Sequence, residues 1–290
     1  PGAHGRHRAR PWRAHRMGAT PVRPLRAILR NARNMIRITD YPLLVFVISG
    51  ALLALSTWFG AGTLRRWRPL ESEVVDDFRV VQGAMLTLLG LIIGFTFSMA
   101  ISRYDQRKNL EAAEANAIGT EFVRADLLPA AEGTKVRALL RQYAEERILF
   151  YTARGRDEEA KSNARTAQLQ NELWAAIGPA ATAHPTPVMA LVLNGMNDVL
   201  NSQGYAQAAW WNRIPPAAWL LMLVIAMGCC VSVGYGARNF RRERWLLLSV
   251  PFIVATSFFS IADIDSPRNG VIRVVPQNLH SLVDSLAPTN

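Results

Sequence analysis

Cysteine and histidine are scarce in this chain, and their placement argues against metal and thiol chemistry. The two cysteines among 290 residues, Cys229 and Cys230, are adjacent inside an apolar run. We interpret them as packing residues that give no information about redox compartment. The five histidines are dispersed: His4, His7, His15, His184 and His280. None has an acidic partner at metal-ligand spacing, so we expect no metal site built on histidine.

The usual signatures of catalysis are also missing. There is no glycine-rich phosphate loop and no nucleophile elbow. We also expect no cleavable signal peptide. Asp263 and Asp265 are an acidic pair that would suit a divalent cation or a proton relay, but Arg268 and Arg273 nearby favour salt bridges and helix caps instead. We therefore expect no enzyme, no catalytic residue, no cofactor and no metal.

Positive charge is unevenly distributed. The chain has 33 basic and 22 acidic residues, yet residues 1–40 hold ten Arg against one Asp, while residues 103–212 balance 12 basic against 13 acidic. This N-terminal arm is interpreted as an orientation signal and a contact for anionic membrane lipids, not as a nucleic-acid site. Residues 1–16 show no apolar pattern and are interpreted as upstream sequence that is set aside. Residues 25–38 are candidates for a helix on the membrane surface.

Long charge-free windows dominate what remains. They cover residues 41–64, 80–102, 214–237 and 245–262. The first three exceed the roughly 18 residues that mark a membrane-spanning helix, and the fourth is just long enough. Because the fourth window contains Pro251, a kinked or re-entrant element is its alternative. The predicted fold class is all-α with four transmembrane spans.

One stretch, residues 83–129, organises the chain. Its apolar half, residues 83–102, passes without proline into the charged sequence Arg103-Tyr104-Asp105. We expect one long helix that is half intramembrane and half soluble.

A helical soluble block follows this rod. The 3.6-residue period and the prolines predict helices ending at Pro129 and over residues 136–151, 157–177 and 188–200. The expected organisation has five parts: a basic arm at 1–40, spans 1 and 2 at 41–102, the soluble helical domain at 103–212, spans 3 and 4 at 213–265, and a tail at 266–290.

Small residues indicate helix packing. Gly90 and Gly94 in the second span form a small-xxx-small pattern, as do Gly228, Ser232 and Gly236 in the third. Such patterns let helices approach closely in lipid, so we expect self-association of the chain. Farther along the rod, acidic and basic residues at helical spacing form a predicted ion-pair face: Arg107, Glu111, Glu114, Glu121 and Arg124.

Orientation follows from the positive residues that flank the spans. The arm favours both termini and the helical block on the cytoplasmic side of a cell inner membrane. Arg238, Arg241, Arg242 and Arg244, in the connection between spans 3 and 4, argue for the reverse.

The rod carries a family resemblance. Six segments of the chain together resemble the bestrophins, and more closely the bacterial bestrophin-like membrane proteins. They are residues 89–95, 103–107, 114–120, 124–129, 214–219 and 263–270. The signature residues among them are Asn116, Thr120, Arg124, Asp263, Asp265 and Arg268.

The resemblance implies four spans, cytoplasmic helices and a pentamer whose second spans line an ion pore. Matching Gly94-Phe95 to the family's pore helix places Thr87, Leu91 and Phe95 at a hydrophobic neck. At the pore mouth Arg103 would favour anions, Glu111 and Glu114 would favour cations, and anions are slightly favoured overall. The calcium clasp of animal bestrophins has no counterpart in this chain.

We therefore expect an oligomeric ion channel that binds lipids, permeant ions and its own copies. The alternative is a non-conducting scaffold or sensor whose helical block binds a partner, with an enzyme a distant third. For any single neck residue, the competing interpretation is that it packs against a neighbouring helix or faces lipid.

Overall fold

The computed structural model describes residues 38–183, 185–237 and 240–287. The chain divides into two units, Pro1–Arg37 and Ile38–Asn290, and all described residues belong to the second. These residues form helices and connections, and no strand occurs among them, which confirms the all-α prediction. The predicted arm and surface helix lie outside the described residues, apart from Ile38–Asp40.

The helices follow one another with short connections. In chain order they are η1 (Ile38–Asp40), α2 (Pro42–Phe59), η2 (Gly60–Leu64), α3 (Arg65–Trp67), η3 (Ser72–Val74), α4 (Val75–Arg124), η4 (Ala125–Leu127), α5 (Ala130–Thr152), α6 (Arg156–Ala183), α7 (Pro187–Trp211), α8 (Pro216–Gly236), α9 (Phe240–Asp265) and α10 (Gln277–Ser285).

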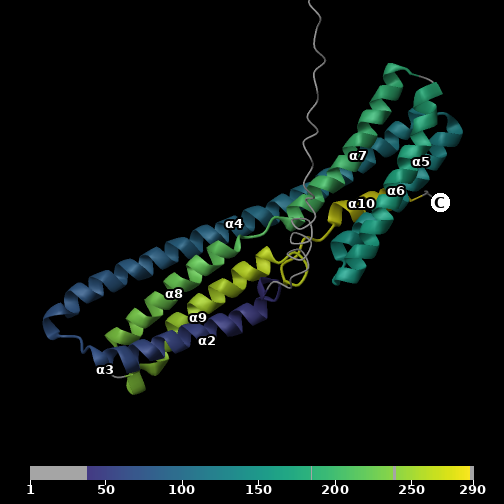
Figure 1. The fold of residues 1–290 in the computed structure, drawn as a ribbon. Coiled ribbons are helices and arrows are strands. Elements are labelled where there is room, and N and C mark those ends of the chain that lie inside the picture. The colour runs from purple at the N-terminus through teal and green to yellow at the C-terminus, as the bar shows by residue number, and fades with distance from the viewer. Residues whose placement is uncertain (1–37, 184, 238–239, 288–290) are drawn as a thin grey trace, which may run out of the picture. The chain divides into compact units, whose positions relative to one another are not determined.

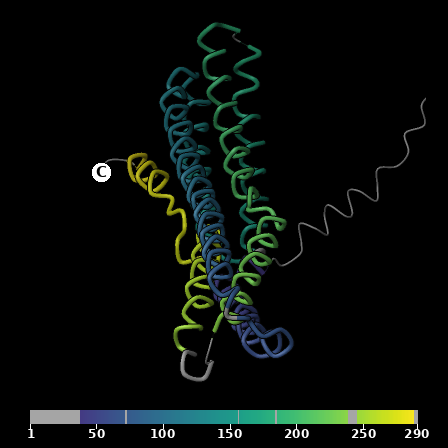
Figure 2. Tube along the Cα trace, turned by 90° about the vertical axis from the view of Figure 1, so that its left-hand side faces the viewer, coloured from purple at the N-terminus to yellow at the C-terminus, as the bar shows by residue number. Residues whose placement is uncertain are grey.

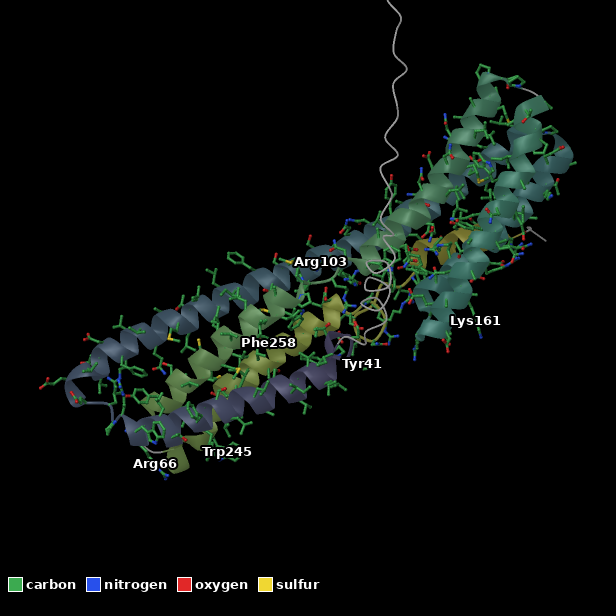
Figure 3. All side chains as sticks on the ribbon, viewed as in Figure 1. Tyr41, Arg66, Arg103, Lys161, Trp245 and Phe258 are labelled. Carbon is green, nitrogen blue, oxygen red and sulfur yellow. The ribbon has the colours of Figure 1, made fainter. Side chains whose placement is uncertain are left out.

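Four helices long and apolar enough to cross a membrane lie side by side, namely α2, the first half of α4, α8 and α9 (Figure 1). Their shared core includes Leu53, Leu89, Ala226 and Phe258. Helix α9 runs without a break through Pro251, so the fourth window is a spanning candidate like the others and not a separate re-entrant element. Arg66 and Trp245 mark the end of this bundle opposite to Tyr41 and Arg103 (Figure 3).

Helix α4 is the continuous rod that the sequence predicts. It spans 50 residues and leaves the four-helix bundle without interruption (Figure 2). Tyr104 packs against both the bundle core and the core of the helical block. Because the apolar window of α4 ends at Ser102, we assign the residues from Arg103 onward to the part of the helix outside the membrane.

The helical block consists of the second half of α4 with α5, α6, α7 and α10 (Figure 1). Its core includes Leu140, Leu173, Val192 and Leu279. Helices α5, α6 and α7 are longer than predicted, and α6 continues through Pro179 instead of ending at Ile177. Helix α4 ends at Arg124, before the predicted stop at Pro129. The start of α7 is sharply defined, because the side-chain oxygen of Thr186 accepts a hydrogen bond from the Met189 amide at 3.2 Å.

Helix α10 was not expected from the sequence, where this region reads as a short apolar tail. The Glu111 carboxylate of α4 accepts hydrogen bonds from the Leu279 amide at 2.9 Å and from the Asn278 side chain at 2.6 Å. One free backbone N–H in the first turn of α10, that of Leu279, is thereby satisfied from a distant helix, and the Asn278 side chain adds a second hydrogen bond. The docking of this segment therefore depends on a carboxylate 168 residues earlier in the chain.

Candidate functional site

One face of α4 remains exposed along almost the whole helix. Residues spaced three and four apart fall within about 40° of a single line on a helix with 3.6 residues per turn. This α4 stripe consists of Asp77, Val80, Ala84, Thr87, Leu91, Phe95, Ser98, Ser102, Asp105, Asn109, Ala113, Asn116, Thr120 and Val123, all of them exposed. The rest of the protomer therefore leaves this face uncovered.

The stripe changes character along its length. Between Val80 and Phe95 it is apolar apart from Thr87, and the side chains of Leu91 and Phe95 are 52% and 66% exposed. From Ser98 to Thr120 it is polar except for Ala113. An open groove lies over the start of the polar part, lined by Ser98, Ile101, Ser102, Asp105, Gln106, Asn109 and Leu110.

The apolar window of α4 is also the least covered of the four. Only 17% of it is buried inside the protomer, against 33% for α2, 28% for the helix that includes α8 and 39% for α9. A Cβ added to Gly90 or to Gly94 would meet no atom within 4 Å. The small-residue pattern in this span therefore faces outward, where lipid or another copy of the chain has room to pack.

The third-span pattern faces inward instead. A Cβ on Gly228 would lie 3.8 Å from the end of Met85, and one on Gly236 would lie 3.0 Å from the ring of Phe78, so both glycines face α4. A close backbone contact elsewhere in the bundle was not predicted. It joins α8 to the C-terminal end of α2 and the start of η2, where a Cβ on Gly234 would overlap the carbonyl oxygen of Thr57 and one on Gly60 would overlap that of Val231.

Arg103 lies where α4 leaves the bundle and belongs to a buried polar junction. Its guanidinium is 3.8 Å from the Asp265 carboxylate, and its side chain is 15% exposed. Arg213 bridges Asp265 and Asp40 at 3.0 and 2.8 Å. Arg107 donates hydrogen bonds to the backbone carbonyls of Ile264 and Asp265. The junction ties the end of α9 to α4 and to the start of α8.

The carboxylates of Asp263 and Asp265 accept hydrogen bonds from backbone amides. Asp263 accepts hydrogen bonds from the amides of Val271 at 2.7 Å and Ile272 at 2.9 Å, which closes the turn after α9. Asp265 accepts one from the Ile214 amide at 3.2 Å. In the part of the chain that the structure describes, no three metal-ligating side chains come together. Asp265 pairs with Arg103 and Arg213, whereas Arg268 pairs with Glu159 and Arg273 donates to the Gly270 carbonyl, so Arg268 and Arg273 are not the partners that the sequence suggested for this acidic pair.

Glu114 is likewise engaged inside the protomer. Its carboxylate is fully buried, pairs with the equally buried Arg147 and accepts a hydrogen bond from the Tyr151 hydroxyl at 3.0 Å. Glu111, also fully buried, holds α10. Both glutamates were expected at a pore mouth, but the structure places them on the covered side of α4, buried inside the protomer.

The remaining signature residues separate into two groups. Asn116 and Thr120 are exposed on the α4 stripe. Arg268 is mostly buried, donates to the carbonyls of Phe150 and Ala153 at 3.0 Å each, and lies 4.6 Å from the Trp210 ring centre. It therefore attaches the segment after α9 to the helical block.

Arg124 lies beside a buried acid. The Glu121 carboxylate has no hydrogen-bond partner among the described residues, and its nearest cation is Arg124 at 3.9 Å. Gly195 of α7 makes room for it, since a Cβ there would overlap Glu121. Burial, with a further contribution from Asp198, outweighs Arg124 and raises the pKa of Glu121 from 4.5 to about 7.

This shift predicts a pH-dependent α4–α7 contact. The folded protein holds the Glu121 proton up to about pH 7, whereas an unfolded chain releases it near 4.5. The folded state therefore binds more protons in this window, and stability falls as pH rises through it, by about 3 kcal/mol. We expect the thermal midpoint in detergent to decrease from pH 4.5 to 7.5 more steeply in the parent than in Glu121→Gln. Parallel curves for the two proteins would contradict the assignment.

Sequence reasoning missed Arg147 and Arg213, which supply the positive charge for Glu114 and Asp265. A signal for Arg147 exists, because it continues the apolar series Val136, Leu140, Tyr143 at helical spacing and is thus a charge on a core-facing stripe. Arg213 has no such pattern, since it lies in the short connection before α8.

Comparisons with known proteins agree with this architecture. A family model described as a Bestrophin-like domain matches residues 51–279. No curated protein matches the chain by sequence. Among solved structures, a bacterial bestrophin homologue from Klebsiella pneumoniae, determined by zinc phasing, is similar with a TM-score of 0.57 and 16% identity, covering 83% of this chain and 95% of that chain. Two point variants of the Klebsiella pneumoniae homologue give TM-scores of 0.59 and 0.58 at 14% identity, each covering 83% of this chain and 97% and 93% of theirs.

Proposed function

This chain belongs to the bestrophin-like family, and from that premise we propose that it is an oligomeric ion channel in which the α4 stripes of several copies, five by family resemblance, surround a pore. The observation that carries the proposal is the long exposed face of α4, apolar where the helix lies in the membrane and polar beyond it. Arranged around an axis, such faces enclose a path with an apolar segment that excludes water (the dry segment) and a polar segment that holds water (the wet segment). We place the channel in a cell inner membrane, in contact with lipids.

Thr87, Leu91 and Phe95 are proposed as the neck of this pore. Rings of Leu91 and Phe95 around an axis form an apolar constriction that conducts only when it is wetted. Since these two side chains are 52% and 66% exposed in the protomer, they contribute little to its own core. Their apolar surface is free to meet a pore, lipid or another copy.

We expect the double variant Leu91→Ala/Phe95→Ala to conduct more ions than the parent. Removing apolar volume at a neck widens and wets it, whereas removing it from a packed core would cost about 2 to 5 kcal/mol per site and reduce yield. The measurement is potassium and chloride flux from liposomes that contain the purified protein. Phe97→Ala is the matched control, because Phe97 lies on a different face of the same helix. Unchanged flux in a normally assembled double variant would exclude the neck assignment.

Gly94 provides a test of assembly. In Gly94→Leu the added side chain meets nothing within the protomer, so the monomer should fold, but the bulk would separate copies that pack along α4. We expect light scattering in detergent to show a smaller particle or a loss of the assembled species. Gly62→Leu, at another glycine with no neighbour within 4 Å, is the control. A Gly94→Leu protein of parental mass and yield would argue against this packing.

The pore mouth differs from the one expected from the sequence. The preference for anions depended on Arg103, and the structure pairs that side chain with Asp265. Because Glu111 and Glu114 are buried as well, our proposal includes none of these three at the mouth. The non-conducting scaffold is the alternative, and liposome flux separates the two: a scaffold passes no ion in the parent or in the neck variant.

A further inference from the structure

We infer that Asp105 lines the wet part of this pore and makes it prefer cations over anions. The inference rests on the proposed channel function and extends it to the class of permeant ion. It reverses the sign of selectivity expected from the sequence.

The spacing of residues along α4 places Asp105 on the side of the helix that faces the proposed pore. It continues the spacing of Leu91, Phe95, Ser98 and Ser102, and its side chain is exposed. Ten residues separate it from Phe95, which corresponds to about 15 Å along a helix that rises 1.5 Å per residue. Asp105 thus lies beyond the dry neck, within the groove that Ser98, Ser102 and Asn109 also line.

The stripe carries charge of one sign. Within α4, all of whose backbone the structure describes, the charged members of the stripe are Asp77 and Asp105, both acidic. Asp77 lies in the first turn of the helix, at the far end of the apolar segment. A pore lined by copies of this face therefore has acidic groups on both sides of its neck.

The nearby basic residues do not offset Asp105 on this face. Arg107 is 1% exposed and donates to backbone carbonyls, and Arg103 pairs with Asp265. Lys108 is exposed, but three residues beyond Asp105 on the helix it lies about 100° from the centre of the stripe. Around a narrow axis the copies of Asp105 add their fields, which concentrates cations and excludes anions.

Charge substitutions at Asp105 test this inference. With a potassium chloride gradient across a bilayer, the reversal potential of the parent should indicate that potassium passes more readily than chloride. Asp105→Asn should lower the potassium-to-chloride permeability ratio at least fivefold, because loss of one unit charge a few ångströms from the ion in water accounts for about that factor and every copy of the chain loses one. Asp105→Arg should favour chloride, and Asp105→Glu should keep the parental preference.

The controls separate a local effect from a general one. Lys108→Gln changes charge by one unit on the same helix, away from the stripe, and should leave the permeability ratio unchanged. The preference of the parent should weaken between 0.1 and 1 M salt, because the screening length falls from about 10 to about 3 Å.

Two results would overturn the inference while leaving the channel in place, namely a parent that prefers chloride, or an Asp105→Asn variant with the parental ratio. A different result would overturn the channel proposal and this inference together: no flux of either ion in the parent and none in Leu91→Ala/Phe95→Ala.

Discussion

Arg147→Met is expected to destabilise the helical block by about 3 to 5 kcal/mol. Arg147 and Glu114 are both fully buried and are paired with each other. Arg147 also lies 4.2 Å from the Phe150 ring centre. Methionine fills much of the volume of arginine but leaves the Glu114 carboxylate buried with Tyr151 as its remaining partner. The measurement is the thermal or denaturant midpoint of the purified protein in detergent.

Two variants make the result specific. Arg141→Met removes an arginine from the exposed Arg141–Glu145 pair on the same helix, and such a pair contributes only about 0.3 to 0.5 kcal/mol. The double variant Glu114→Leu/Arg147→Met removes both buried charges and should regain much of the lost stability. If Arg147→Met is no less stable than Arg141→Met, the buried pair does not hold α4 to α5.

Gly234→Ala is expected to destabilise the membrane bundle by about 1 to 3 kcal/mol. The added methyl would occupy the position of the Thr57 carbonyl oxygen, and backbone cannot move aside as a flexible side chain does. Helix α8 would have to separate from the C-terminal end of α2, which also loosens the contact between Gly60 and Val231. We expect a lower thermal midpoint and a lower yield from membranes.

Gly62→Ala is the matched control for this prediction. Gly62 lies two residues from Gly60 in η2, and a Cβ there meets nothing within 4 Å. It should therefore behave like the parent, with the small gain in stability that alanine brings to a helix. Equal midpoints for Gly234→Ala and Gly62→Ala would show that the two helices are not in the close contact described.

The amino-acid sequence by itself determined the four spans and the long α4. These features depend on the length of apolar runs and on the period of the residues, which are local properties. No proline occurs between Gly83 and Leu128, so the helix continues from lipid into water. The family could likewise be predicted, because its motifs are short continuous segments such as residues 89–95 and 263–270.

Tertiary structure alone decided which charged residues of α4 are covered by other helices and which are exposed. Arg103, Glu111 and Glu114 follow one another along α4 much as Asp105 and Asn109 do, and nothing local marks the first three as residues with partners inside the protomer. Their partners are Asp265, the start of α10 and Arg147, which lie 162, 168 and 33 residues away. Burying a charge is costly unless a partner lies beside it, so helix packing determines which face of α4 is covered and leaves Asp105 exposed.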